Sequence, residues 1–81
     1  MAGAVKTTPY FRDMRRRADR TAILDAWIEA AIRSPIRERV QTDGRIRRWV
    51  YVPARGRYLR VVLLRDGETV HNAFFDRGFR P

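Results

Sequence analysis

The chain of 81 residues has no cysteine, a single histidine and a single lysine. Without cysteine, disulfides, thiolate catalysis and zinc sites with thiolate ligands are excluded. A single histidine also excludes an acid–base pair of two histidines within the chain. No segment reaches the roughly 18 apolar residues that a membrane span needs. These absences predict a domain that has no membrane partner.

Other familiar signatures of cofactor sites are also missing. No glycine-rich phosphate loop is present, no metal motif with two histidines is possible, and the carboxylates are scattered along the chain. We therefore predict neither a metal nor a nucleotide cofactor. The first residues, MAGAVKTTPYF, lack the apolar stretch of a signal peptide. Together with the absence of cysteine, this favours the cytoplasm as the expected location.

Positive charge is the main feature of the composition. There are 18 basic and 9 acidic residues, for a net charge of +9, and all basic residues except Lys6 are arginine. Arginine grips phosphate with two donors and stacks on bases, so this composition indicates a polyanion partner, most simply nucleic acid. Alternatives are an acidic protein partner, or a general surface charge that reflects arginine-rich codon usage.

The first half of the chain predicts two helices. Thr8-Pro9 is a typical helix start, with Thr8 as N-cap and Pro9 in the first turn. A second helix is expected after a cap at Asp19 or Thr21, and it should end at Ser34-Pro35. Residues 1–8 are expected to form a short strand or a loose arm. The apolar residues at helical spacing in the second helix are Ile23, Leu24, Trp27, Ile28, Ala31 and Ile32.

The second half predicts four strands separated by turns. The turn signals are Asp43-Gly44, the segment 53–56 and Asp66-Gly67; Asp-Gly is a preferred pair in two-residue hairpins, where both positions need positive φ. We therefore predict one α+β domain over residues 1–81. Two N-terminal helices should pack on one face of a four-stranded antiparallel meander.

Alternation along the strands separates two faces. The predicted helix-facing side carries Ile46, Val50, Val52, Leu59, Val61, Leu63, Val70 and Phe74, with Arg48 and Asn72 among them. The other side carries Arg45, Arg47, Trp49, Tyr51, Tyr58, Arg60, Val62, Thr69, His71 and Phe75. Because the helices cover one face only, the basic and aromatic face should remain free to bind a ligand.

The residues of this free face suggest RNA chemistry. His71 can exchange a proton near neutral pH, and arginines such as Arg60 can stabilise charge on a phosphate. The alternative is a half-buried structural histidine. A second proton carrier would be Asp76, Glu68, Tyr58 or Tyr51, or an arginine would act by charge alone. The expected phosphate ligands are Arg45, Arg47 and Arg60.

Two aromatic residues and one carboxylate have alternative roles. Trp49 and Tyr58 can stack RNA bases, or they can pack across the strands and stiffen the sheet. Asp76-Arg77 directly follows the last strand. We expect an ion pair that holds the C-terminal tail, with a contribution to a site as the alternative.

The order of elements and one long segment resemble a known family. Two helices ending at SP and a four-stranded meander resemble the RelE-type toxins of bacterial toxin–antitoxin pairs. The segment GRIRRWVYVPARGRYLRVVLLRDGETVHNAFFDRGF (residues 44–79), above all LRVVLLRDGETVHNAFFDR, is similar to a BrnT-like family in or near that superfamily. The resemblance implies an endoribonuclease that cleaves messenger RNA, often at the ribosome, and that a co-expressed antitoxin neutralises. Arg60 and His71 match the positions of the family's catalytic residues best.

Some features depart from the family, and two other functions fit the residues. The lysines common in RelE-type sites are missing, and Asn72 follows His71 where some relatives have tyrosine. The first alternative is a non-catalytic nucleic-acid-binding module. The second is a basic domain that binds an acidic protein partner, which could be the antitoxin itself.

Overall fold

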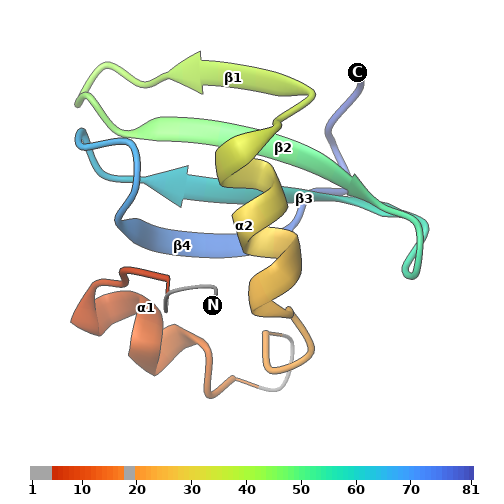
Figure 1. Cartoon of the computed structure of the whole chain (residues 1–81), viewed down its shortest axis with the longest axis horizontal. Coiled ribbons are helices and arrows are strands. Elements are labelled where there is room, and N and C mark those ends of the chain that lie inside the picture. Colours follow the sequence, from red (N-terminus) through yellow and green to blue (C-terminus); the bar gives the residue numbers. More distant parts are fainter. Residues whose placement is uncertain (1–4, 18–19) are drawn as a thin grey trace.

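A computed structural model describes residues 5–17 and 20–81, which form two helices followed by four strands (Figure 1). The strands pair antiparallel in the order β1-β2-β3-β4, which confirms the predicted α+β meander. The elements are α1 (Pro9–Met14), α2 (Asp25–Arg33), β1 (Arg37–Val40), β2 (Ile46–Val52), β3 (Arg57–Leu63) and β4 (Val70–Phe75).

Helix α1 starts where the sequence predicts. The Thr8 hydroxyl accepts a hydrogen bond from the Phe11 amide at 3.1 Å, and Pro9 opens the first turn. The helix lies beside the edge strand β4, not over the middle of the sheet, so the prediction that both helices pack on one face is not confirmed for α1 (Figure 1). Its buried Phe11 belongs to the core. A short strand or a loose arm was expected over residues 1–8; residues 1–4 lie outside the described residues, and Thr7 forms an isolated bridge with Val70.

Helix α2 begins later than predicted. Residues 20–23 form turns, in which the Ile23 amide donates to the Arg20 carbonyl, and Leu24 occupies the N-cap position without a side-chain cap. Thr21 is therefore not the cap, and Asp19 lies outside the described residues. These turns still bury Ile23 in the core. The helix ends at Arg33, just before Ser34-Pro35, as predicted.

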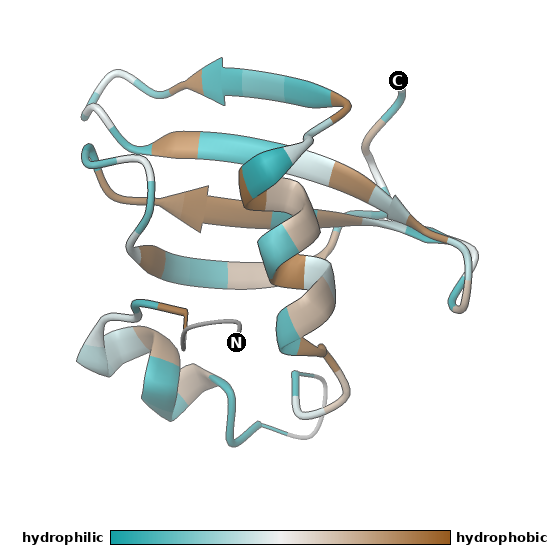
Figure 2. Ribbon diagram, in the orientation of Figure 1, coloured by the Kyte–Doolittle hydropathy of each residue, from teal (hydrophilic) through white to brown (hydrophobic). Residues whose placement is uncertain are grey.

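The hydrophobic core lies between α2 and one face of the sheet. Ile28 and Ala31 of α2 are fully buried, as are Leu59, Val61 and Leu63 of β3. Figure 2 shows β3 brown along much of its length, whereas β1 is mostly teal. The two central strands thus supply the apolar surface that α2 covers, and β3 contributes three fully buried side chains to it. Neither described helix is long and apolar enough to cross a bilayer.

The Asp-Gly turns form, but not as two-residue hairpins. Gly44 has φ of +89° and Gly67 has φ of +73°, while no described residue other than glycine has positive φ. Asp43 instead accepts a hydrogen bond from the Arg45 amide, and residues 41–45 make a longer loop. The aspartates act through their carboxylates and the glycines through their backbone.

A bulge in β4 changes the predicted faces of that strand. Val62 pairs with Asn72 and Leu63 pairs with Val70, so His71 has no partner on β3. Beyond the bulge, Phe75 packs against the core and Phe74 lies on the opposite face. The sides predicted for these two phenylalanines are therefore wrong. The predicted helix-facing side of Asn72 is also wrong, because Asn72 pairs with Val62 on the opposite face.

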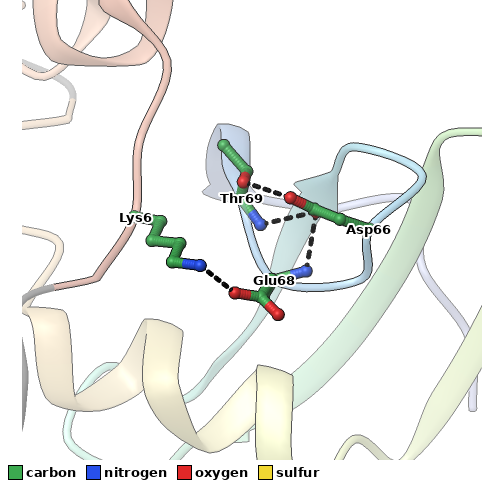
Figure 3. A network of polar contacts seen from close by, with 4 residues as sticks. All are labelled: Lys6, Asp66, Glu68 and Thr69. Atoms are coloured by element: carbon green, nitrogen blue, oxygen red, sulfur yellow. Dashed lines mark hydrogen bonds and ion pairs between the residues drawn. The ribbon is translucent and has the colours of Figure 1, made fainter.

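The turn between β3 and β4 contacts the N-terminal segment and holds it in place (Figure 3). Asp66 accepts hydrogen bonds from the Thr69 hydroxyl and from the amides of Glu68 and Thr69, which together lower the pKa of Asp66 to about 2. Glu68 forms an ion pair with Lys6. The Thr8 amide then donates to the Val70 carbonyl at 3.0 Å. These contacts hold Thr8 next to the start of β4.

Candidate functional site

The candidate site lies on the face of the sheet opposite α2, here called the open face. Trp49 pairs with Arg60, Tyr51 with Tyr58, and Arg47 with Val62, so these side chains share that face. This is the arrangement predicted for β2 and β3. The central strands therefore present arginines and aromatic rings away from the core.

Three predicted arginines meet the lone histidine on the open face. A shallow hollow of about 230 Å³, here called the His71 hollow, is lined by Arg45, Arg47, Arg60 and His71. The β4 bulge allows this, because it leaves both His71 and Asn72 on the hollow. The hollow therefore combines a titratable ring with several fixed positive charges.

His71 is held in place from α1. Its Nδ1 lies 3.1 Å from the Thr8 hydroxyl, and its ring stacks on Tyr10 with centroids 4.8 Å apart. Thr8 thus caps α1 and positions His71 with the same oxygen. Tyr10 is not among the site residues predicted from the sequence. Only the position of α1 beside β4 brings the two rings together.

The surroundings of His71 favour its neutral form. Partial burial lowers the pKa of His71, and the positive charge of Arg45 lowers it further, while Asp43 acts weakly in the opposite direction. The ring is therefore mostly uncharged at pH 7. A neutral imidazole can accept a proton, which is the requirement for a general base.

Arg47 is the arginine of the hollow that is free to bind an anion. Its Nε is buried and has no hydrogen-bond partner among the described residues. Its guanidinium also forms no ion pair with a described carboxylate, so it can pair with an anion. Arg45 is less available, because its Nε lies 3.7 Å from the Asp43 carboxylate.

Arg60 is already engaged. Its Nε and Nη2 donate to Asp76 Oδ2 at 2.9 and 2.7 Å. Its guanidinium also lies over the rings of Trp49 and Phe74, with 5.6 and 4.9 Å from Cζ to the ring centroids. The expected Asp76-Arg77 ion pair is not formed. Asp76 holds Arg60 instead, so Arg60 presents its charge from a fixed position.

The C-terminal tail covers the two aromatic residues that were predicted to stack bases. Phe79 stacks on Trp49 with centroids 4.8 Å apart and an angle of 16° between the rings, and it meets the Tyr58 ring edge-on at 5.1 Å. Trp49 is only 5% exposed and donates its Nε1–H to Asp76. A packing role therefore suits Trp49 better than a role in stacking RNA bases. Phe79 was missed because residues after the last strand follow no alternating pattern.

The proposed second proton carriers lie away from the histidine. None of them lines the His71 hollow. Asp76 is bound to Arg60 and Trp49, Glu68 to Lys6, and Tyr51 packs against Tyr58. Among the described residues that line the hollow, His71 is thus the one side chain whose ordinary pKa lies near neutral pH.

In the described part of the chain, no group of three histidine, aspartate or glutamate side chains is arranged to hold a metal ion.

Comparisons with known proteins found no matching family model, no similar curated protein and no similar solved structure. The resemblance of residues 44–79 to a BrnT-like family stays a prediction from the sequence.

Proposed function

We propose that this chain is the toxin of a bacterial toxin–antitoxin pair, and that it is a RelE-like, metal-independent endoribonuclease that cleaves messenger RNA in the cytoplasm. One observation carries the proposal: His71, with its lowered pKa, lies in one hollow with Arg45, Arg47 and Arg60. This is the combination that phosphodiester cleavage by a neighbouring 2′-hydroxyl requires. The likeness of the 44–79 segment to BrnT-like toxins agrees with it.

His71 acts as the general base in this proposal. The Thr8 oxygen has two lone pairs, so it can accept from both the Phe11 amide and the Nδ1–H of His71. This tautomer leaves Nε2 free to take the proton of the RNA 2′-hydroxyl. The 2′-oxygen then bonds to phosphorus and the bond to the 5′-oxygen breaks. The departing oxygen takes a proton from water, and the products end in a 2′,3′-cyclic phosphate and a 5′-hydroxyl.

The arginines stabilise the charge that grows on the phosphate. Arg47 contributes most, because it is the arginine of the hollow that forms no ion pair with a described carboxylate. Arg45 adds charge at the rim of the hollow, and Arg60 acts as a fixed positive charge from its place beside Asp76. Such prearranged donors need no reorganisation during the reaction, which makes them effective.

Tyr10 replaces Trp49 and Tyr58 as the base-stacking residue of the proposal. Its side chain is exposed, since Tyr10 retains 49% of its accessible surface, and one side of its ring stacks on His71. The remaining ring surface can carry an RNA base next to the reacting phosphate. Stacking of this kind contributes about 1–3 kcal/mol per base.

A second function, the binding of RNA without cleavage, is favoured by one observation. No second proton carrier that titrates near neutral pH lines the His71 hollow among the described residues. The open face would then hold single-stranded RNA through Arg45 and Arg47 without cleaving it. In both cases the same surface suits an acidic antitoxin, which would block it by charge complementarity.

Induced expression in bacteria tests the ribonuclease directly. We expect growth arrest and RNA fragments with 2′,3′-cyclic phosphate ends, and the purified protein should cut RNA in the presence of EDTA. The variant Arg45→Ala/Arg47→Ala should abolish both effects. The charge-matched variant Arg33→Ala/Arg55→Ala should retain them, because neither arginine lines the hollow. Intact RNA with the wild-type protein, in cells and in vitro, contradicts the proposal.

A further inference from the structure

A second and larger cavity opens on the same face, between β1 and the C-terminal tail. This tail cleft has a volume of about 430 Å³, and Trp49, Asp76 and Phe79 form part of its wall. It contains five of the chain's arginines: Arg37, Arg39, Arg47, Arg60 and Arg80. The proposed cleavage step uses only Arg47 and Arg60 of this group.

Most of the positive charge of the tail cleft is not neutralised. Arg60 pairs with Asp76, and the other carboxylate of the cleft, Glu38, pairs with Arg48 at 2.7 Å. Among the described residues, no carboxylate lies within ion-pair distance of the remaining arginines: Arg37, Arg39, Arg47 and Arg80. Four uncompensated guanidinium groups in a concave surface create a strong field for an anion.

The cleft keeps its shape through the tail. Asp76 fixes the start of the tail to Arg60 and Trp49, and Phe79 stacks on the Trp49 ring. The Arg37 guanidinium lies 5.7 Å from the centre of the Phe79 ring. The arginines on β1 are thus held near an aromatic wall before any ligand arrives, which reduces the entropy lost on binding.

The tail cleft and the His71 hollow adjoin each other. Both are lined by Arg47 and Arg60, so these two arginines are shared by the two cavities. An extended polyanion that enters one cavity meets the other next, whereas a small isolated anion would occupy only one.

We propose that the tail cleft binds the RNA phosphodiester next to the one that is cleaved in the His71 hollow. This inference rests on the proposed function and makes the substrate a single strand that spans at least two consecutive phosphates. RNA is favoured over an acidic peptide for two reasons. The guanidinium groups lie beside aromatic rings, which suit bases, and the cleft adjoins the His71 hollow. Arg37 and Arg80 line this cleft and do not line the His71 hollow, so they distinguish the two.

The test measures affinity for a 2′-O-methyl hexanucleotide, which cannot be cleaved because its 2′-hydroxyls are blocked. We expect Arg37→Ala/Arg80→Ala to bind about 10- to 100-fold more weakly than wild type. The slope of log affinity against log salt should fall by about 0.7 for the phosphate contact that is lost. Arg33→Ala/Arg55→Ala carries the same change in charge outside both cavities and should stay within about threefold of wild type. A hexanucleotide with a 5′-phosphate should bind like one without it, because the cleft takes an internal phosphodiester.

Each outcome separates the cleft from the ribonuclease proposal. If Arg37→Ala/Arg80→Ala binds like its matched control while Arg45→Ala weakens binding, the tail cleft is not part of the RNA path and the proposed function stands. If the double variant weakens binding but the wild-type protein never cleaves RNA, the cleft stands and the ribonuclease falls. If wild type at low salt binds polyglutamate and not the hexanucleotide, the cleft serves an acidic protein and both RNA proposals are overturned.

Discussion

We expect His71→Ala to cut RNA about 10²- to 10⁴-fold more slowly than wild type, which is the usual contribution of a positioned general base. The loss should appear in kcat, with little change in affinity for a non-cleavable oligonucleotide. The reason is that the arginines of the His71 hollow provide the phosphate contacts. Single-turnover cleavage of a labelled oligonucleotide is the measurement, with folding checked by circular dichroism.

The pH dependence gives a second signature of the same residue. A base works when it is unprotonated, so the rate should fall as pH drops through the pKa of His71, which lies below its ordinary value of 6.5. Arg45→Ala removes one cause of that lowering and should move the acidic limb to higher pH. Partial burial, the larger cause, remains. The described polar and charged groups around the ring are Thr8, Tyr10, Gln41, Asp43, Arg45, Arg47, Arg60 and Asn72.

Two results would speak against the catalytic role. If His71→Ala retains a rate within about threefold of wild type, the ring is structural, as the contact with Thr8 alone would allow. If the variant loses RNA affinity together with the rate, His71 contributes to binding and not to proton transfer. Arg33→Ala serves as the control for the pH profile, because Arg33 is on α2 and does not line the hollow.

The second large effect concerns Asp76. Asp76→Ala is expected to lower the free energy of unfolding by about 2–3 kcal/mol, because it removes charge-assisted hydrogen bonds from the partly buried Arg60 and the buried Trp49. For a domain of this size, that corresponds to a fall in Tm of roughly 10–20 °C. Urea unfolding followed by Trp fluorescence is the measurement. Without the Asp76 hydrogen bonds the tail is no longer fixed, and Phe79 can leave the Trp49 ring. The Trp fluorescence of the folded state should therefore change.

The effect should depend on pH with a defined sign. Burial alone would raise the pKa of Asp76, but hydrogen bonds from Trp49 and Arg60 and the charge of Arg60 outweigh it and hold the pKa below its usual value. A carboxylate with a lowered folded-state pKa stabilises the fold above its unfolded pKa, which is about 3.9, and the contribution disappears as pH falls through the folded value. The difference between wild type and Asp76→Asn should therefore be large at pH 7 and shrink in acid.

Asp25→Ala is the matched control for Asp76. Asp25 pairs with Arg15 at 2.6 Å, but its side chain is more than half exposed. An exposed pair of this kind contributes less than about 1 kcal/mol. Equal losses of stability for the two variants would contradict the role given to Asp76, and so would a loss at Asp76 that is independent of pH.

The start of α1, the end of α2 and the faces of β2 and β3 were predictable from the sequence. Thr8-Pro9 gives the start of α1, and Pro35 limits the end of α2, because both follow from the geometry of single residues. Alternation placed Arg47 and Arg60 on one face of β2 and β3, since those strands pair without interruption. The open face could therefore be described from the sequence alone wherever a strand is regular.

The errors have two physical sources. The bulge at His71 shifts the alternation by one residue, so the predicted sides of Phe74 and Phe75 were exchanged. Bulges have no reliable local signal, because they depend on the register with the neighbouring strand. The fold of the tail depends on long-range contacts of Asp76 and Phe79 with β2 and β3, which no pattern within the tail shows.

The central claim is that RNA binds the open face, and NMR mapping tests it most directly. Adding the 2′-O-methyl hexanucleotide to labelled wild-type protein should shift the signals of Arg47, Arg60 and His71, and leave those of α2, on the covered side of the sheet, almost unchanged. Shifts confined to α2, or none at low salt, would contradict the account.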